Sequence, residues 1–155
     1  MLNSLYIHFP FCIHLCNYCD FYKKPLKSDT QIEEYLELLY SQIHSLAKLM
    51  EEKGEKFEPL ETLYMGGGTP SLLKPDKLEQ LLRKLEDYNI RLSGDYEFTI
   101  EVDPGTFNQA ELEQWTKIGV NRFSVGVQAY NQSDLEILDR RHQLNDINEC
   151  LNLLQ

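Results

Sequence analysis

Along the chain, short apolar runs alternate with stretches in which apolar residues recur at helical spacing, and this pair of patterns occurs four times. Short runs rich in β-branched and aromatic residues predict strands, whereas apolar residues recurring every three or four positions predict amphipathic helices. The predicted strands cover residues 5–9, 60–65, 96–102 and 122–127. A helical pattern follows each of them, so strands and helices alternate throughout.

The first helical pattern is the longest. Ser28 is a candidate N-cap, and Gln31 stands three residues later as its capping-box partner. Apolar residues then recur on one helical face as far as Met50. A charged stretch around Gly54 ends this predicted helix.

The later helices carry start and stop signals of their own. Pro75 opens one helix, and Asn108 caps the next, which Gly119 ends. Ser133 starts a short helix, and a last apolar stripe begins at Ile147. Four strand–helix units in succession predict an α/β fold, with a parallel sheet and right-handed crossovers. Ligand sites of such folds form at the carboxyl ends of the strands.

Length and charge narrow the range of functions. The 155 residues are enough for one domain, and 42% of them are hydrophobic, which predicts a folded core. The net charge of −10, without a stripe of Lys and Arg, argues against a nucleic-acid partner. No secretory signal is visible, and the first apolar run is too short to span a membrane. We therefore expect a cytoplasmic protein without a membrane span.

The chain ends inside an apolar helical stripe. No Gly, basic last turn or Pro stands there to stop the helix. Four units also cannot close a barrel, and they leave the strand at 122–127 with an unpaired edge. We therefore expect residues 1–155 to be the N-terminal part of a longer protein.

Three of the four cysteines lie in one short loop. Cys12, Cys16 and Cys19 have the spacing C-x3-C-x2-C, directly after the first predicted strand. Iron–sulfur clusters of four irons are normally held by four thiolates, so three would leave one iron open to a substrate or cofactor. A Cys3His zinc site completed by His8 or His14 is an alternative, and unligated thiols are another. Cys150 lies on an apolar helix side and is expected in the core.

A run of glycines follows the second predicted strand. Gly66-Gly67-Gly68-Thr69-Pro70 lacks both the Gly-Lys-Ser/Thr of a phosphate loop and the G-x-G-x-x-G spacing. The absence of Cβ atoms lets a ligand approach the backbone closely and bind to exposed amides. A plain tight turn is the alternative.

Other polar side chains are placed to reach the same edge of the sheet. Glu101 and Gln128 lie at the ends of the third and fourth strands, where they can accept or donate hydrogen bonds. Tyr6 stands six residues before the first cysteine, and Arg140 can bind a carboxylate. For each of these residues taken alone, packing or a surface charge is the commoner explanation, and His142 is similarly ambiguous.

Together, these segments have a specific order over essentially the whole chain: Tyr6-Ile7-His8-Phe9-Pro10-Phe11-Cys12, Cys16-Asn17-Tyr18-Cys19-Asp20-Phe21, the Gly-Gly-Gly-Thr-Pro turn, Glu101-Val102-Asp103-Pro104 and Gly126-Val127-Gln128. In this order they resemble the oxygen-independent coproporphyrinogen III oxidase family of radical S-adenosylmethionine (SAM) proteins. The resemblance implies the first four units of an open (β/α)6 barrel of the TIM type.

The resemblance also implies cofactors and residue roles. Cys12, Cys16 and Cys19 match the ligands of a 4Fe-4S cluster, whose open iron binds SAM. The positions that match SAM contacts are Tyr6, Gly67, Gly68, Thr69, Glu101, Gln128 and Arg140. An electron donor and a heme or porphyrinogen ligand are the further partners that the family implies.

Two subgroups share this pattern. The oxidase decarboxylates two propionates of coproporphyrinogen III and carries another cysteine two residues after the third cluster cysteine, where this chain has Phe21. The Cys19-Asp20-Phe21 sequence and the Arg140-Arg141-His142 sequence resemble the heme chaperone (HemW-type) subgroup, which we favour. The oxidase and a zinc-dependent interaction module are the competing hypotheses.

Overall fold

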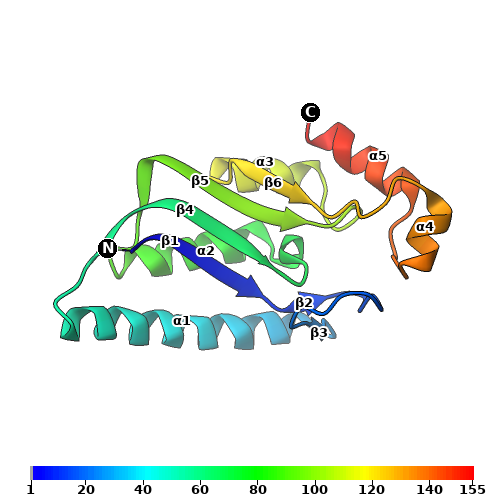
Figure 1. Cartoon of the computed structure of the whole chain (residues 1–155). Coiled ribbons are helices and arrows are strands. Elements are labelled where there is room, and N and C mark those ends of the chain that lie inside the picture. Colours follow the sequence, from blue (N-terminus) through cyan, green and yellow to red (C-terminus); the bar gives the residue numbers. More distant parts are fainter. Residues whose placement is uncertain (1) are drawn as a thin grey trace.

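A four-stranded parallel sheet forms the centre of the computed structural model, which describes residues 2–155. Its strands are β1 (Leu2–Phe9), β4 (Phe57–Gly67), β5 (Leu92–Val102) and β6 (Arg122–Val125), in the spatial order β1-β4-β5-β6 (Figure 1). The predicted α/β class and parallel sheet are therefore confirmed. Every strand pairs with its neighbour in sequence order, as right-handed βαβ connections favour.

The strands differ from their predicted bounds at the ends. β4 and β5 begin earlier than expected, and the pairing shifts register between Leu60 and Thr62. A shift of this kind lets a polar start join the sheet without the regular alternation that a sequence pattern detects. β6 ends at Val125 instead of residue 127, because the amide of Val127 turns back to the carbonyl of Val125 at 3.0 Å.

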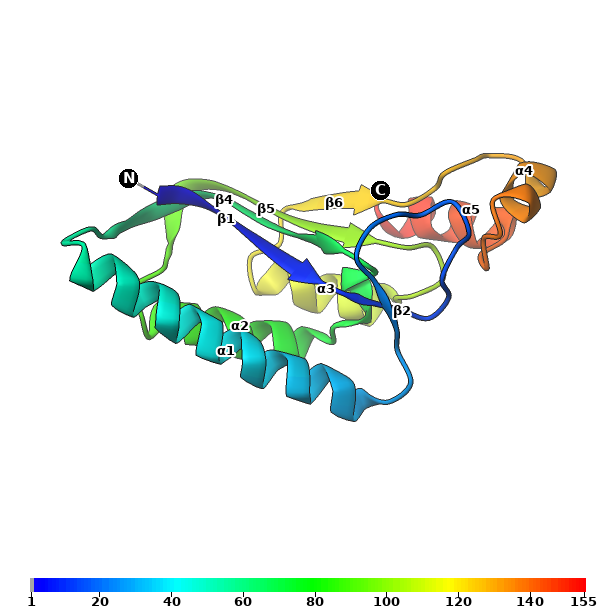
Figure 2. The ribbon, with the colours of Figure 1, turned by 60° about the horizontal axis from the view of Figure 1, so that its bottom comes forward.

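Three helices cover one face of the sheet: α1 (Asp29–Glu52), α2 (Pro75–Glu86) and α3 (Gln109–Lys117) (Figure 2). The capping residues predicted for α1 and α3 are confirmed. The Gln31 side chain accepts from the amide of Ser28 at 3.3 Å, and Asn108 exchanges hydrogen bonds with Glu111. Among the helices within residues 2–155, none is both long and apolar enough to cross a membrane.

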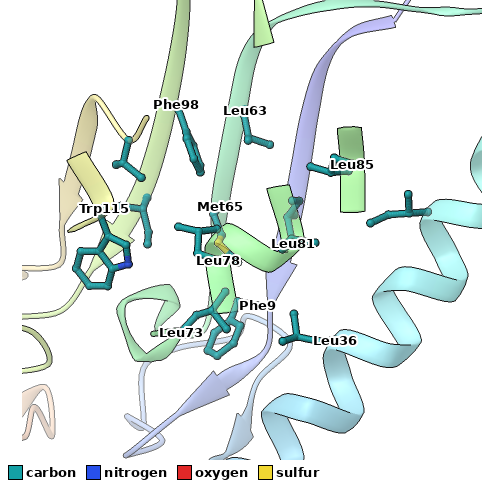
Figure 3. Packing of buried hydrophobic residues seen from close by; sticks show 14 of the residues in the cluster. Phe9, Leu36, Leu63, Met65, Leu73, Leu78, Leu81, Leu85, Phe98 and Trp115 are labelled. Atoms are coloured by element: carbon teal, nitrogen blue, oxygen red, sulfur yellow. The ribbon is translucent and has the colours of Figure 1, made fainter. Parts of the chain in front are cut away.

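The core lies between this helical layer and the sheet. Phe9, Leu63 and Phe98 extend from three strands toward the apolar sides of α1 and α2 (Figure 3). Trp115 of α3 is completely buried and lies between Phe107 and Phe123. Fully burying a large apolar side chain contributes about 1.5–3 kcal/mol, so this layer holds the strands in position.

The opposite face of the sheet carries polar side chains. Tyr6, Tyr64, Thr99 and Arg122 are successive partners in one row across the four strands. The rings of Tyr6 and Tyr64 are stacked, with centroids 6.0 Å apart. The two faces thus separate the core from a surface that can carry chemistry.

The cysteine segment is more ordered than a plain loop. It contains two short parallel strands that the sequence did not predict, β2 (Phe11–Cys12) and β3 (Lys24–Pro25). The amide of Leu26 donates to the carbonyl of Cys12 at 2.8 Å. This pairing fixes both ends of the segment that holds the three cysteines.

Two helices complete the described chain. The short helix α4 (Gln132–Ile137) begins one residue before the predicted start, because its N-cap is Asn131, whose side chain accepts from the amide of Ser133 at 2.9 Å. The last apolar stripe forms α5 (Leu144–Leu153). Cys150 of this helix is 2% exposed, which confirms its place in the core.

Candidate functional site

A cavity of about 560 Å³ opens at the carboxyl ends of the strands. Its size is within the usual range for ligand pockets. The predicted site residues that line it are Cys12, Cys16, Cys19, Gly67, Gly68, Thr69, Glu101, Gln128 and Arg140. The expected convergence of four loops on one face is therefore present in the structure.

The three cysteines have different surroundings within this cavity. Cys12 is buried on β2, and burial raises the pKa of its thiol, although a hydrogen bond with Thr69 acts in the opposite direction. Cys16 and Cys19 are half-buried, and the amide of Cys19 donates to the carbonyl of Cys16 at 3.3 Å. One thiol thus lies on a strand paired with β3, while the other two lie between β2 and β3 and line the cavity.

At each glycine of the turn at the end of β4, a different neighbouring residue occupies the space that a Cβ would need. A Cβ at Gly66 would lie 2.8 Å from the Tyr64 ring, and one at Gly67 would lie 2.6 Å from the His8 ring. A Cβ at Gly68 would meet the carbonyl oxygen of Phe11 at 2.6 Å. Close packing against the protein itself therefore requires these glycines, beyond the ligand approach that the sequence suggested.

Glu101 is the penultimate residue of β5 and lies beside this turn. One of its carboxylate oxygens accepts from the Tyr64 hydroxyl at 2.8 Å, and the other accepts from the Gly67 amide at 3.1 Å. Burial and the bond to this carboxylate raise the pKa of Tyr64. The carboxylate is therefore oriented by two donors and keeps further lone pairs for a ligand.

Gln128 lies in the loop that follows β6. Its φ of 63° is in the left-handed region, which is uncommon for residues other than glycine. Its side chain is exposed at the cavity rim. Unusual backbone conformations of this kind are concentrated at functional sites.

Arg140 reaches the cavity from the segment after α4. Asp139 takes the left-handed conformation there, with φ of 53°, and the amide of Arg140 donates to the carbonyl of Leu135 at 2.9 Å. These features form a Schellman ending of the helix, which fixes where Arg140 leaves it. Its Nη1 lies 3.6 Å from Cys16 Sγ and 3.3 Å from the Tyr18 hydroxyl.

Tyr6 is the one predicted contact that does not line the cavity among the described residues. Its hydroxyl lies 3.1 Å from His8 Nδ1, and His8 Nε2 lies 2.9 Å from the carbonyl oxygen of Tyr22. A carbonyl only accepts, so the His8 proton is on Nε2 and the Tyr6 hydroxyl donates to Nδ1. The Tyr6 ring stacks on that of Tyr64, whose hydroxyl donates to Glu101, so Tyr6 lies beside the site.

The two histidines considered as a fourth zinc ligand have other partners here. His8 joins Tyr6 to the cysteine segment, as described above. His14 Nε2 lies 3.1 Å from a carboxylate oxygen of Asp139. Within residues 2–155, no group of three or more His, Cys, Asp or Glu side chains is arranged to hold a single metal ion.

Sequence reasoning did not assign roles to two residues of the site. Asp103 forms an ion pair with Arg140, and His142 is buried, with its Nδ1 3.2 Å from Arg140 Nη2. In the sequence, Asp103 stands out only within a short motif, and His142 alone is ambiguous. Their positions in the sequence could have indicated these roles, because Asp103 comes directly after β5 and His142 comes two residues after Arg140, a candidate SAM contact.

The residues present suit an iron–sulfur cluster with a ligand beside it. Three thiols line one cavity, and a guanidinium donates toward the sulfur of Cys16. Buried polar atoms on the same wall, Arg140 Nε and His142 Nε2, have no hydrogen-bond partner among residues 2–155. Buried polar groups without partners are rare in folded proteins, so a polar ligand is expected on this wall.

Comparisons with known proteins show the family of this chain. Residues 6–155 match the model of the radical SAM superfamily. The heme chaperone HemW of Synechocystis sp. is 38% identical, over 99% of this chain and 37% of that protein. HemW of Escherichia coli K12 is 34% identical, over 90% of this chain and 35% of that protein.

A solved structure gives the same result for the fold. Coproporphyrinogen III oxidase (HemN) from Escherichia coli, described as a radical SAM enzyme, superimposes with a TM-score of 0.84 and 31% identity. The match covers 97% of this chain and 33% of that protein, so the chain spans about a third of the length of these relatives. On both sequence and structure, the chain belongs to the radical SAM superfamily.

Proposed function

We propose that the full-length protein binds a 4Fe-4S cluster through Cys12, Cys16 and Cys19, with SAM at the open iron. One observation carries this proposal: the three thiols share a single cavity with every candidate SAM contact except Tyr6. When bound and reduced, such a cluster supplies an electron for the cleavage of SAM.

The chain's own residues would bind and orient SAM. The carboxylate of Glu101, which Tyr64 and Gly67 already orient, can accept hydrogen bonds from the amino or hydroxyl groups of SAM. The guanidinium of Arg140 can donate to a carboxylate, and Thr69, Gly68 and Gln128 add polar groups along the rim. Tyr6 would contribute through a change in its side-chain direction, since its hydroxyl now faces His8.

For the biological role, we propose a HemW-type heme chaperone, in the cytoplasm, that works with an electron donor and binds heme. Two features support this choice: Phe21 stands where the oxidase has a further cysteine, and the curated relatives named above are heme chaperones. The second candidate is the oxidase itself, which the structural match to HemN favours. For either role, we propose that residues 1–155 are the N-terminal part of the radical SAM core domain.

Metal analysis of the anaerobically reconstituted full-length protein tests the cluster. We expect about four irons with matching labile sulfide, and a change in the absorption spectrum when SAM is added. Cys16→Ser should lose most of the iron, whereas Cys150→Ser, which removes a core thiol on α5, should keep it. Zinc without iron or sulfide would instead support the interaction module.

Heme titration separates the two biological roles. A heme chaperone is expected to shift the Soret band of added heme in proportion to protein concentration. An oxidase is expected to convert coproporphyrinogen III, which can be followed by porphyrin fluorescence after oxidation of the products. Conversion without a Soret shift would overturn the chaperone proposal while leaving the cluster proposal intact.

A further inference from the structure

The guanidinium of Arg140 contacts several groups of the protein itself. Its Nη2 faces three acceptors: a carboxylate oxygen of Asp103, the carbonyl of Gly126 at 3.3 Å and His142 Nδ1 at 3.2 Å. These partners come from the ends of two neighbouring strands and from the segment after α4. The side chain of Arg140 is only 11% exposed.

His142 has a defined protonation state in this arrangement. Arginine has donors and no acceptor, so the contact with Arg140 needs Nδ1 as the acceptor and the proton on Nε2, while Nδ1 also lies 3.5 Å from a carboxylate oxygen of Asp103. The imidazole is therefore neutral beside the guanidinium. Burial, followed by the charge of Arg140, lowers the pKa of His142 in agreement with this assignment.

Asp103 is itself fixed in place by its backbone. Its amide donates to the Ser71 hydroxyl at 3.3 Å, and its carbonyl accepts from the Thr106 hydroxyl at 2.6 Å. Ser71 is completely buried. The carboxylate that faces Arg140 thus stands on a rigid support, independent of the cysteine loop.

This ion pair is partly buried, with the Asp103 side chain 28% exposed, and it does little for stability. The cost of removing two charges from water offsets most of their attraction, and apolar residues of similar volume are often as stabilising. The pair is also outside the core between sheet and helices. Its effect is geometric: it leaves Nη1 directed at Cys16 and Tyr18, and it leaves Nε without a partner among the residues described.

We propose that Asp103 and His142 are positioning residues that lock the Arg140 guanidinium between the cysteine loop and the ligand cavity. The identity of the ligand as SAM rests on the proposed function, whereas the locking itself does not. With Nη2 occupied by protein and Nε enclosed, the guanidinium lines the cavity and directs its Nη1 at the cysteine loop. A single rigid group thereby links Cys16 to the bound ligand.

The locking can be measured in the protein without any cofactor. In the full-length apoprotein labelled with ¹⁵N, the Nε–H of Arg140 is expected as a slowly exchanging signal, identified by its loss in Arg140→Lys. Charge-assisted hydrogen bonds contribute about 1.5–3 kcal/mol, so Asp103→Asn should speed this exchange about tenfold or more. Asp134→Asn removes the same charge from exposed α4 and should leave the exchange rate unchanged.

Two substitutions of His142 test the second positioning residue. His142→Phe keeps a ring but removes the acceptor, and it should speed the exchange of the Arg140 signal. His142→Asn places an amide oxygen near the position of Nδ1 and should restore slow exchange at least in part. Equal exchange rates in both variants would show that His142 only fills space.

A double-mutant cycle then tests the effect on the ligand. In the reconstituted protein, Asp103→Asn should weaken SAM binding about tenfold, the lower end of the range for groups that orient ligands, with iron content unchanged. In an Arg140→Ala background the same substitution should cost nothing further, because Asp103 acts through Arg140. An equal loss in both backgrounds overturns the positioning role.

The two measurements also separate this proposal from the proposed function. If the wild-type protein binds neither iron nor SAM, the proposed function fails, and the exchange of the Arg140 signal still decides whether Asp103 holds the guanidinium. If the wild-type protein binds SAM and Asp103→Asn changes neither the exchange rate nor the affinity, the positioning proposal alone is overturned.

Discussion

The amide of Gly67 donates a hydrogen bond to Glu101 at 3.1 Å, which ties the glycine turn after β4 to the end of β5. The same carboxylate accepts from Tyr64 at 2.8 Å. Two neighbouring strands thus share one acidic group at the point where the cavity begins. The turn and the carboxylate therefore form one structural unit, although 34 positions separate them in the chain.

Glu101→Gln should weaken this unit without unfolding it. A glutamine offers a single acceptor oxygen, so one of the two donors loses its partner, and the charge is removed as well. We expect a loss of about 1–2 kcal/mol in the free energy of unfolding and weaker SAM binding in the reconstituted protein. Urea unfolding and SAM titration measure the two effects, and an unchanged SAM affinity would contradict the assigned role of Glu101.

Gly68→Ala should disturb the cysteine segment. The added Cβ would lie 2.6 Å from the carbonyl oxygen of Phe11, which is backbone and cannot rotate away. Overpacking of this kind costs about 1–3 kcal/mol and here displaces the strand that carries Cys12. The measurement is the iron content after reconstitution, together with the unfolding midpoint.

Gly94 supplies the matched control for that substitution. A Cβ at this position of β5 would meet nothing within 4 Å. Gly94→Ala should therefore retain the iron content and at least the wild-type stability. If both alanine variants lose iron equally, the close contact at Gly68 is not the cause.

Trp115 should dominate the stability of the layer between α3 and the sheet. It is completely buried, and its Nε1 has no hydrogen-bond partner within residues 2–155. Trp115→Ala is expected to cost about 3–5 kcal/mol. Trp115→Phe should cost clearly less, because it retains a ring and removes an unsatisfied donor, and urea unfolding of the two variants will show the difference.

His142 should make stability depend on pH. Its pKa is lowered in the folded protein, whereas an unfolded histidine titrates near pH 6.5. The unfolded state therefore binds more protons below about pH 6.5, and the free energy of unfolding falls as the pH falls from there. One such group contributes a slope of at most about 1.4 kcal/mol per pH unit.

Comparison of variants isolates this contribution. Urea unfolding of the apoprotein above and below about pH 6.5 should give a smaller pH dependence for His142→Phe than for wild type. His44→Gln changes a histidine on α1, outside the cavity, and should keep the wild-type slope. Identical slopes in all three proteins would mean that His142 keeps its proton equilibrium on unfolding.

Local chemistry explains which parts of this fold were predictable from the sequence. The caps at Ser28 and Asn108 and the stop at Gly119 fix helix ends through contacts within a few residues, so the pattern is sufficient. The convergence of the cysteines with Glu101 followed from parallel topology, because strand ends meet at one edge.

The remaining features depend on contacts distant in sequence. The pairing of β2 with β3 leaves no periodic signal in two residues. The direction of the Tyr6 hydroxyl is decided by His8, and the reason for three glycines is found in neighbours such as Phe11. The role of Asp103 depends on its ion pair with Arg140, which lies after α4 and is distant in sequence.

The contact between Arg140 and Cys16 spans 124 positions of the chain. During synthesis at about 5–20 residues per second, the cysteines precede their arginine by roughly 6–25 s. Throughout this interval the nascent chain displays three thiols before the wall that faces them exists. Iron for the proposed cluster would therefore have open access to the loop until β6 and α4 assemble.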